Sequence, residues 1–139
     1  MKQKYAFLSW GLLLLMGCEK SEPQPALLGQ WEWVQSQATG YTSAGAVVHT
    51  PPLETPLTSG PQQLVISADS LNVHTRYGII FQGYRRDQQV LTITPERGSG
   101  YTMHIQELTA NRLVMKSELH NLADPSGEVT RIAISEFAR

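Results

Sequence analysis

The sequence contains only one cysteine among its 139 residues, so the chain cannot form an intrachain disulfide. It also has no excess of charge of either sign. Eleven Lys and Arg residues balance twelve Asp and Glu residues, giving a formal net charge of −1 and no basic footprint for nucleic acid. No window of eleven or more residues shows the apolar stripe of an amphipathic helix. The length accommodates one domain with little left over.

The sequence lacks the short motifs that mark catalytic and metal sites. It contains no H-E-x-x-H, C-x-x-C, G-x-S-x-G or phosphate-binding loop. Its four histidines are scattered, without a local metal-ligand spacing: His49, His74, His104 and His120. We therefore expect no enzymatic activity, no metal site and no cofactor.

Apolar residues are concentrated at the N-terminus. Lys2 and Lys4 precede twelve uncharged residues, 5–16. A helix needs about 20 residues to cross the bilayer core, whereas a signal-peptide core needs about 7–15. The segment therefore predicts a signal-peptide helix, the alternative being a buried N-terminal helix.

This segment ends in Leu15-Met16-Gly17-Cys18, which resembles the lipobox of bacterial lipoproteins. The resemblance implies that residues 1–17 are removed and that Cys18 carries a diacylglyceryl thioether and an amide-linked acyl chain such as palmitate. Several acyl chains on one residue anchor a protein stably in a membrane. Residues 18–26 are polar after the cysteine and contain two prolines, which predicts a flexible tether. We expect attachment to the cell envelope, at the periplasmic face or outer surface of the outer membrane.

From residue 26 onward the apolar residues follow the strand period of two. Short runs separated by turn residues predict eight strands, namely 28–37, 63–68, 71–76, 79–86, 89–94, 101–108, 112–120 and 128–138. Eight hairpin-linked strands favour an antiparallel up-and-down β-barrel over residues 27–139, because closure removes exposed sheet edges. An open sandwich is the alternative. Residues 38–61 form a connection of unusual length, expected to be a lid or disordered.

The first predicted strand opens with Gly29-Gln30-Trp31, which matches the G-x-W motif of lipocalins. The order of the following segments resembles the lipocalin-like domains of Bacteroidetes lipoproteins; these segments are 28–34, 63–69, 83–84, 91–93, 105–109, 112–115 and 137–139. The resemblance implies a barrel closed at one end by Gly29 and Trp31, with an arginine of the last strand stacked on the tryptophan. Arg139 is the better match for that arginine and Arg131 is the alternative.

Trp31 and Trp33 share one face if the first strand is regular, and Gln35 and Gln37 continue that face toward the open end. Inward glutamines would be either hydrated or bonded to a ligand. The candidate ligand-binding residues are Trp33, Gln35, Gln37, Tyr41, Met103 and Met115. We predict a monomeric protein that binds a small hydrophobic ligand at the barrel mouth. The alternative is a packed barrel that serves as an interaction module for an envelope protein.

Overall fold

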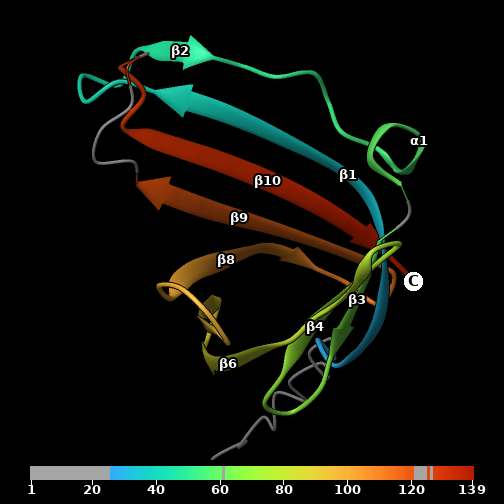
Figure 1. The fold of residues 1–139 in the computed structure, drawn as a ribbon. Helices are drawn as coiled ribbons and strands as arrows, with labels where there is room; N and C mark the ends of the chain where they lie inside the picture. Colours follow the sequence, from blue (N-terminus) through green and yellow to red (C-terminus); the bar gives the residue numbers. More distant parts are fainter. Residues whose placement is uncertain (1–25, 61, 121–124, 126) are drawn as a thin grey trace, which may run out of the picture.

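The computed structural model describes residues 26–60, 62–120, 125 and 127–139, which form an antiparallel, nearly closed β-barrel (Figure 1). The predicted signal peptide (1–17), Cys18 and the tether up to residue 25 lie outside the described residues. The elements are β1 (Gly29–Tyr41), β2 (Val47–His49), α1 (Pro56–Ser59), β3 (Gln63–Ile66), β4 (Leu71–Thr75), β5 (Gly78–Ile80), β6 (Gln82–Asp87), β7 (Val90–Pro95), β8 (Tyr101–Leu108), β9 (Arg112–His120) and β10 (Thr130–Ala138).

The strand order is β5-β4-β3-β1-β10-β9-β8-β7-β6, and every pair is antiparallel. Strands adjacent along this path follow one another in the chain, except that β10 returns to β1 and that β2 and α1 separate β1 from β3. The predicted antiparallel all-β barrel is confirmed, but the predicted count of eight is wrong, because nine strands lie along the sheet. A further strand, β2, pairs with the end of β1.

The additional strand arises because the segment predicted as one strand, 79–86, is interrupted at Phe81. Its first part, β5, pairs with β4, and its second part, β6, pairs with β7. The ladder between β6 and β7 ends where Gln82 lies opposite Pro95, and proline has no N–H to continue it. Residues before Gln82 therefore have a strand partner only on the β4 side.

The barrel seam between β4 and β6 is closed by few hydrogen bonds. A single bridge pairs Ser70 with Gly83, and the Tyr84 N–H donates to the Asp69 carbonyl over 3.0 Å. No ladder joins β5 to β6. The barrel is consequently almost closed rather than continuous.

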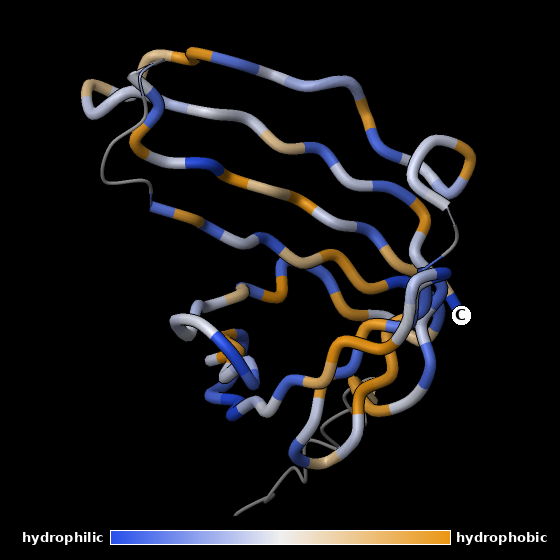
Figure 2. The backbone as a smooth tube through the Cα atoms, in the orientation of Figure 1, coloured by the Kyte–Doolittle hydropathy of each residue, from blue (hydrophilic) through white to orange (hydrophobic). Residues whose placement is uncertain are grey.

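Apolar side chains that alternate along the strands form one core. The side chains of Trp31, Leu91, Ile93 and Leu113 have no exposed surface. The core cluster is Leu27, Trp31, Leu64, Ile66, Leu71, Leu91, Ile93, Ile105, Leu113 and Met115. Figure 2 shows apolar residues concentrated around β3 and β4, near the C-terminus, and fewer along the far ends of β1 and β10.

A β-bulge changes the orientation of side chains halfway along β1. Trp33 lies opposite Phe137 but Gln35 lies opposite Glu136, so Val34 is an extra residue on β1. Beyond the bulge, Ser36 takes the inner face, and its Oγ lies 2.5 Å from Ser135 Oγ. The expectation that Gln35 and Gln37 continue the Trp33 face is wrong, because one inserted residue reverses the alternation.

The long connection pairs with β1 in its described part, so the expectation that 38–61 is disordered is wrong. Residues 38–41 extend β1, and the chain then returns beside β1 (Figure 1). Ser36 and Glu54 exchange two backbone hydrogen bonds of 2.9 Å, and the Trp33 N–H donates to the Gln62 carbonyl. This segment covers the edge of β1 that β3 is too short to reach.

The walls of the barrel have unequal heights. The long wall consists of β1, β10 and β9, which contain 13, 9 and 9 residues. The short wall consists of β3, β4 and β5, which contain 4, 5 and 3 residues. The ladder between β1 and β3 ends where Glu32 pairs with Gln63. The inner face of the long wall beyond Trp33 therefore has no short-wall strand opposite it at the same height.

Candidate functional site

At the closed end, Trp31 and Arg139 form the stacked pair that the lipocalin resemblance implies. The Arg139 guanidinium carbon lies 3.9 Å from the centroid of the Trp31 ring. The buried indole N–H donates to the Leu27 carbonyl over 2.8 Å. Arg139 Nη2 also donates to the carbonyls of Ala26 (3.0 Å) and Leu28 (2.5 Å), so it ties the start of the barrel to its end.

Gly29 is placed where a side chain would be strained. Its φ angle is +129°, and a Cβ atom there would lie 3.1 Å from Arg139 Nη2. Glycine therefore lets the arginine approach the backbone. The alternative arginine, Arg131, lies near the opposite end of β10 and pairs with Glu128 (2.9 Å).

Trp33, Met103 and Met115 occupy the inner face where the packed core gives way to the open half. Trp33 is 6% exposed and Met115 is 1% exposed, whereas Met103 is partly buried against the core. Met115 lies opposite Ser135, and Met103 lies opposite Ser117. These three predicted ligand-binding residues therefore lie on the barrel interior.

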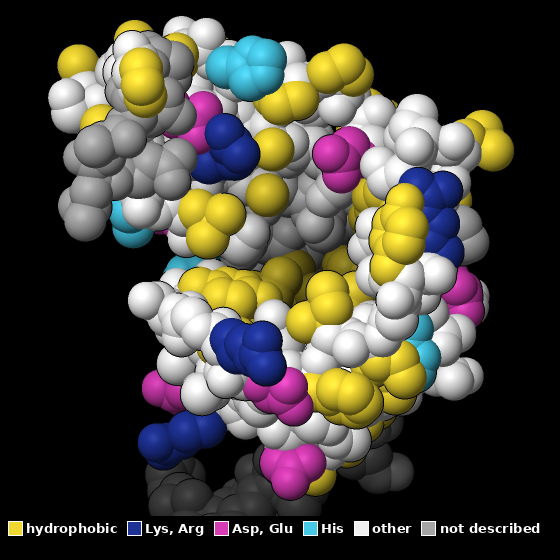
Figure 3. Space-filling view, viewed as in Figure 1, with side chains coloured by type: hydrophobic (Ala, Val, Ile, Leu, Met, Phe, Trp, Pro, Cys, Tyr) yellow, Lys and Arg dark blue, Asp and Glu magenta, His cyan; other side chains and the backbone are white. Residues whose placement is uncertain are grey.

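Beyond these residues, the inner face of the long wall carries small side chains. The pairings of β1 with β10 and of β10 with β9 place on it Ser36, Ala38, Gly40, Ala133, Ser135 and Ser117, followed at the far end by the larger Arg131 and Leu119. Figure 3 looks onto a hollow between the long wall above and the short wall below, with hydrophobic side chains at its base. A cavity of about 180 Å³ in this region is lined by Ser36, Ala38, Pro51, Pro52, Glu54, Arg131 and Ala133. We name this inner face beyond Trp33 the open hollow.

A polar clamp holds the far end of the open hollow. Glu128 is 2% exposed, and one of its carboxylate oxygens accepts from Arg131 Nε over 2.9 Å. A Cβ atom on Gly40 would lie 2.2 Å from Glu128 Oε2. Glycine at position 40 therefore leaves the space that the Glu128 carboxylate occupies.

The remaining three predicted ligand-binding residues do not face the open hollow. The Gln35 amide donates to Glu136 Oε2 (2.9 Å), and the Gln37 amide donates to the Pro51 carbonyl (2.7 Å). Tyr41 lies opposite Thr130, on the face opposite to Gly40. The small residues Ala38 and Ala133, which line the open hollow, were absent from the predicted site because the bulge at Val34 has no marker in the sequence.

The outer face near Gln35 carries an ion-pair cluster. Arg112 contacts both Glu107 and Glu136, with Arg112 Nε 2.8 Å from Glu136 Oε1. Hydrogen bonds from Arg112, and secondarily from Gln35, hold the pKa of Glu136 below its ordinary value, and the two carboxylates raise the pKa of Arg112. This cluster is solvent-facing and stabilises the β8–β9–β10 surface only modestly.

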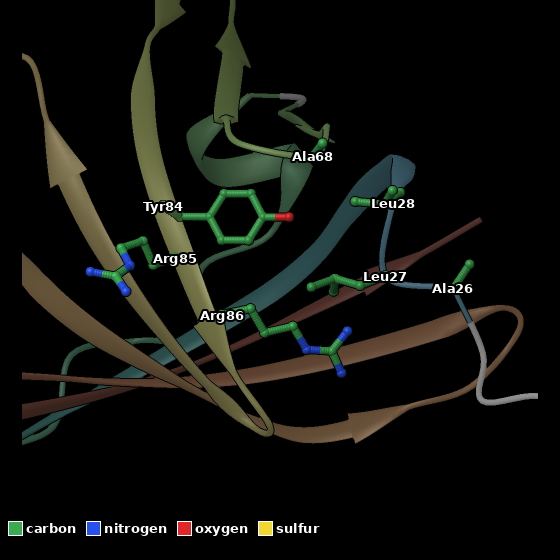
Figure 4. A pocket seen from close by; sticks show the side chains of 7 residues that line it. All are labelled: Ala26, Leu27, Leu28, Ala68, Tyr84, Arg85 and Arg86. Carbon is green, nitrogen blue, oxygen red and sulfur yellow. The ribbon is translucent and has the colours of Figure 1, made fainter.

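A larger cleft of about 740 Å³ opens at the closed end, along the seam beside β6 (Figure 4). Tyr84 and Arg86 point toward Leu27 and Leu28, whereas Arg85 points away. The Tyr84 hydroxyl donates to the Ser67 carbonyl over 2.7 Å, and burial raises the pKa of this phenol. None of the lining residues was among the predicted site residues; they are Ala26, Leu27, Leu28, Ala68, Tyr84, Arg85 and Arg86.

Across the described residues, no set of three or more His, Cys, Asp or Glu side chains is arranged to hold a metal ion. The part of the chain that the structure describes also contains no helix long and apolar enough to cross a membrane. Comparison of the chain with protein-family models, with curated proteins and with solved structures found no match.

Proposed function

We propose that this chain is a lipoprotein, anchored to the cell envelope through Cys18, whose lipocalin-like barrel binds a small, mostly apolar molecule in the open hollow. The lipobox-like residues 15–18 support the anchor. The up-and-down strand order and the stacking of Arg139 on Trp31 support the lipocalin-like assignment. We propose no enzymatic activity and no cofactor.

The observation that carries the ligand proposal is the unequal height of the barrel walls. The short wall stops at the level of Trp33. For this reason, no protein layer lies above Met103 and the apolar base of the open hollow. A guest that covers apolar side chains releases water from them, which is the main favourable term in such binding.

The small side chains of the long wall make this proposal sterically reasonable. Ala38 and Ala133 leave room above the sheet, whereas larger residues at these positions would fill it. The hydroxyls of Ser36 and Ser135 lie between the two alanines and the core. These hydroxyls offer hydrogen bonds to one polar group of a guest. A compact apolar molecule fits this lining if its polar end faces the serine hydroxyls or the Glu54 and Arg131 side chains.

Binding can be measured with residues 19–139, since every residue of the core cluster lies between Leu27 and Met115 and every described strand is retained. The probe is the neutral dye N-phenyl-1-naphthylamine, whose emission rises in apolar surroundings. In Ala133→Phe the new ring occupies the open hollow, and we expect the affinity to fall at least about tenfold. The matched control is Ile134→Phe on the outer face of the same strand, which should bind the dye as the unmodified protein does.

The cleft beside β6 serves as a second control. Leu28→Gln changes the lining of the cleft without touching the open hollow and should leave dye binding unchanged. If Leu28→Gln lowers the affinity and Ala133→Phe does not, the dye binds in the cleft and our assignment of the site is wrong. Failure of the unmodified protein to take up the dye would contradict ligand binding itself.

A second candidate function is that of a protein-interaction module, and the apolar side chains exposed along β5 favour it. In that case an envelope protein would bind the outer surface and the barrel would need no small-molecule guest. Crosslinking on intact cells distinguishes the two functions. One reproducible protein partner, together with no dye binding by residues 19–139, would favour the interaction module.

A further inference from the structure

Strand β5 is an exposed apolar edge of the sheet. It pairs with β4 on one side, and no strand of the described chain pairs with its other side. Ile79 and Ile80 are 46% and 52% exposed, and the flanking Tyr77 and Phe81 are 83% and 51% exposed. We call residues 77–81 the β5 edge.

Apart from the shortness of β5, which has three residues, this edge lacks the features by which proteins prevent their sheets from pairing with other chains. Natural edge strands are protected by very short length, lysine, proline, inward charges or a covering loop. Residues 77–84 contain neither a charged residue nor a proline. The nearest charged side chain, Arg76, stacks on the Tyr77 ring with its guanidinium carbon 4.6 Å from the centroid. The β5 edge is therefore chemically suited to strand pairing.

We propose that the β5 edge is a dimerisation surface, on which β5 of a second copy of this chain pairs antiparallel across a two-fold axis. A two-fold interface must be complementary to itself. The β5 edge meets this requirement because its side chains are all uncharged, so no register brings like charges together. Cross-strand contacts between isoleucines and aromatic rings would add to the backbone hydrogen bonds.

The exposed area sets the strength of this dimer. With about 200 Å² for a large side chain, the exposed fractions give roughly 450 Å² per copy, against about 800 Å² in a standard interface. The dimer is therefore weak and concentration-dependent in solution. Anchoring both copies in one membrane would raise their effective concentration. This proposal replaces the monomer expected from the sequence, and it does not depend on a ligand in the open hollow.

Disulfide trapping tests the pairing directly, because residues 19–139 contain no cysteine. Ile79→Cys places one thiol on the β5 edge, and a mild copper–phenanthroline oxidant should convert it to a covalent dimer. Ile134→Cys is the matched control, since Ile134 is 42% exposed but lies on β10, inside the sheet. We expect rapid crosslinking of the first variant and little of the second. Equal rates for both variants would show random collision and overturn the proposal.

Sedimentation velocity gives an independent test. Residues 19–139 should show a sedimentation coefficient that rises with concentration toward that of a dimer. Ile79→Lys adds a charge to the edge and should keep the protein monomeric, whereas Ile134→Lys should still dimerise. Circular dichroism of each variant checks that the barrel is folded. A protein that stays monomeric at every concentration, or a dimer that survives Ile79→Lys, would overturn the proposal.

Discussion

The two halves of the barrel share the same three long strands but are stabilised differently. In the closed half, β1, β10 and β9 contribute Trp31, Phe137 and Leu113 to an apolar core, and Arg139 covers the tryptophan. In the open half, the same strands present serine, alanine and glycine on their inner face. An ion pair between the buried Glu128 and the partly exposed Arg131 holds the far end.

This difference shows how one sheet can combine stability with an accessible surface. The closed half buries large apolar side chains, which is the dominant favourable contribution to folding. The open half keeps its backbone hydrogen bonds but has little apolar area to bury. Its strands are held by their ladders and by the segment that pairs with the edge of β1. We therefore expect the free energy of unfolding to depend mainly on the closed half.

The largest expected effect is that of Trp31→Ala. Removing this fully buried ring leaves a cavity and abolishes the Arg139 stack, so the free energy of unfolding should fall by about 3–5 kcal/mol. Urea denaturation of residues 19–139 measures the change. Val34→Ala, at the exposed bulge, is the comparison and should cost far less. Equal losses in the two variants would contradict the division into a packed and an open half.

An intermediate effect is expected for Gly40→Ala in the open half. The added Cβ would lie 2.2 Å from Glu128 Oε2, so the carboxylate must move away and its pairing with Arg131 is disturbed. We expect a loss of about 1–3 kcal/mol, measured by thermal unfolding. Gly83→Ala is a suitable control, because its nearest neighbour atom would be 3.7 Å away. A Gly40→Ala protein as stable as the control would show that the clamp contributes nothing.

The smallest effect is expected on the outer face, at Glu136. Because the pKa of this carboxyl is lowered in the folded protein, its pairing with Arg112 stabilises the fold at pH values above the ordinary glutamate value of 4.5. This contribution is lost as the pH falls from 4.5 through the lowered pKa. Glu136→Gln should therefore lower the Tm by no more than about 2 °C at pH 7. As the pH falls below 4.5, the Tm of the variant should decrease less steeply than that of the unmodified protein. An unchanged acid dependence of the Tm would contradict the pairing.

Much of the closed half could be predicted from the sequence, because its signals are local. Alternation of apolar residues predicted the positions of most strands, and the G-x-W match led to the correct expectation that Arg139 stacks on Trp31. The strand predicted at 79–86 was placed correctly, but its division into β5 and β6 was not predicted. Its interruption depends on Pro95 of another strand, which is 13 residues away from Gln82.

Half of the candidate site could not be predicted, because it depends on pairing between distant strands. Trp33, Met103 and Met115 lie on the interior as expected, whereas Gln35, Gln37 and Tyr41 lie on the outer face. A β-bulge is defined by two residues facing one on the partner strand, and that partner is about 100 residues away in the sequence.

The sequence by itself determined the class of fold. A period of two, a turn residue after nearly every apolar run and the absence of a helical stripe allow an antiparallel β-structure and little else. Only the tertiary structure decided which side chains line the interior, how tall each wall is and where the seam stays open. These features follow from the register between strands, and register depends on the packing of the whole barrel.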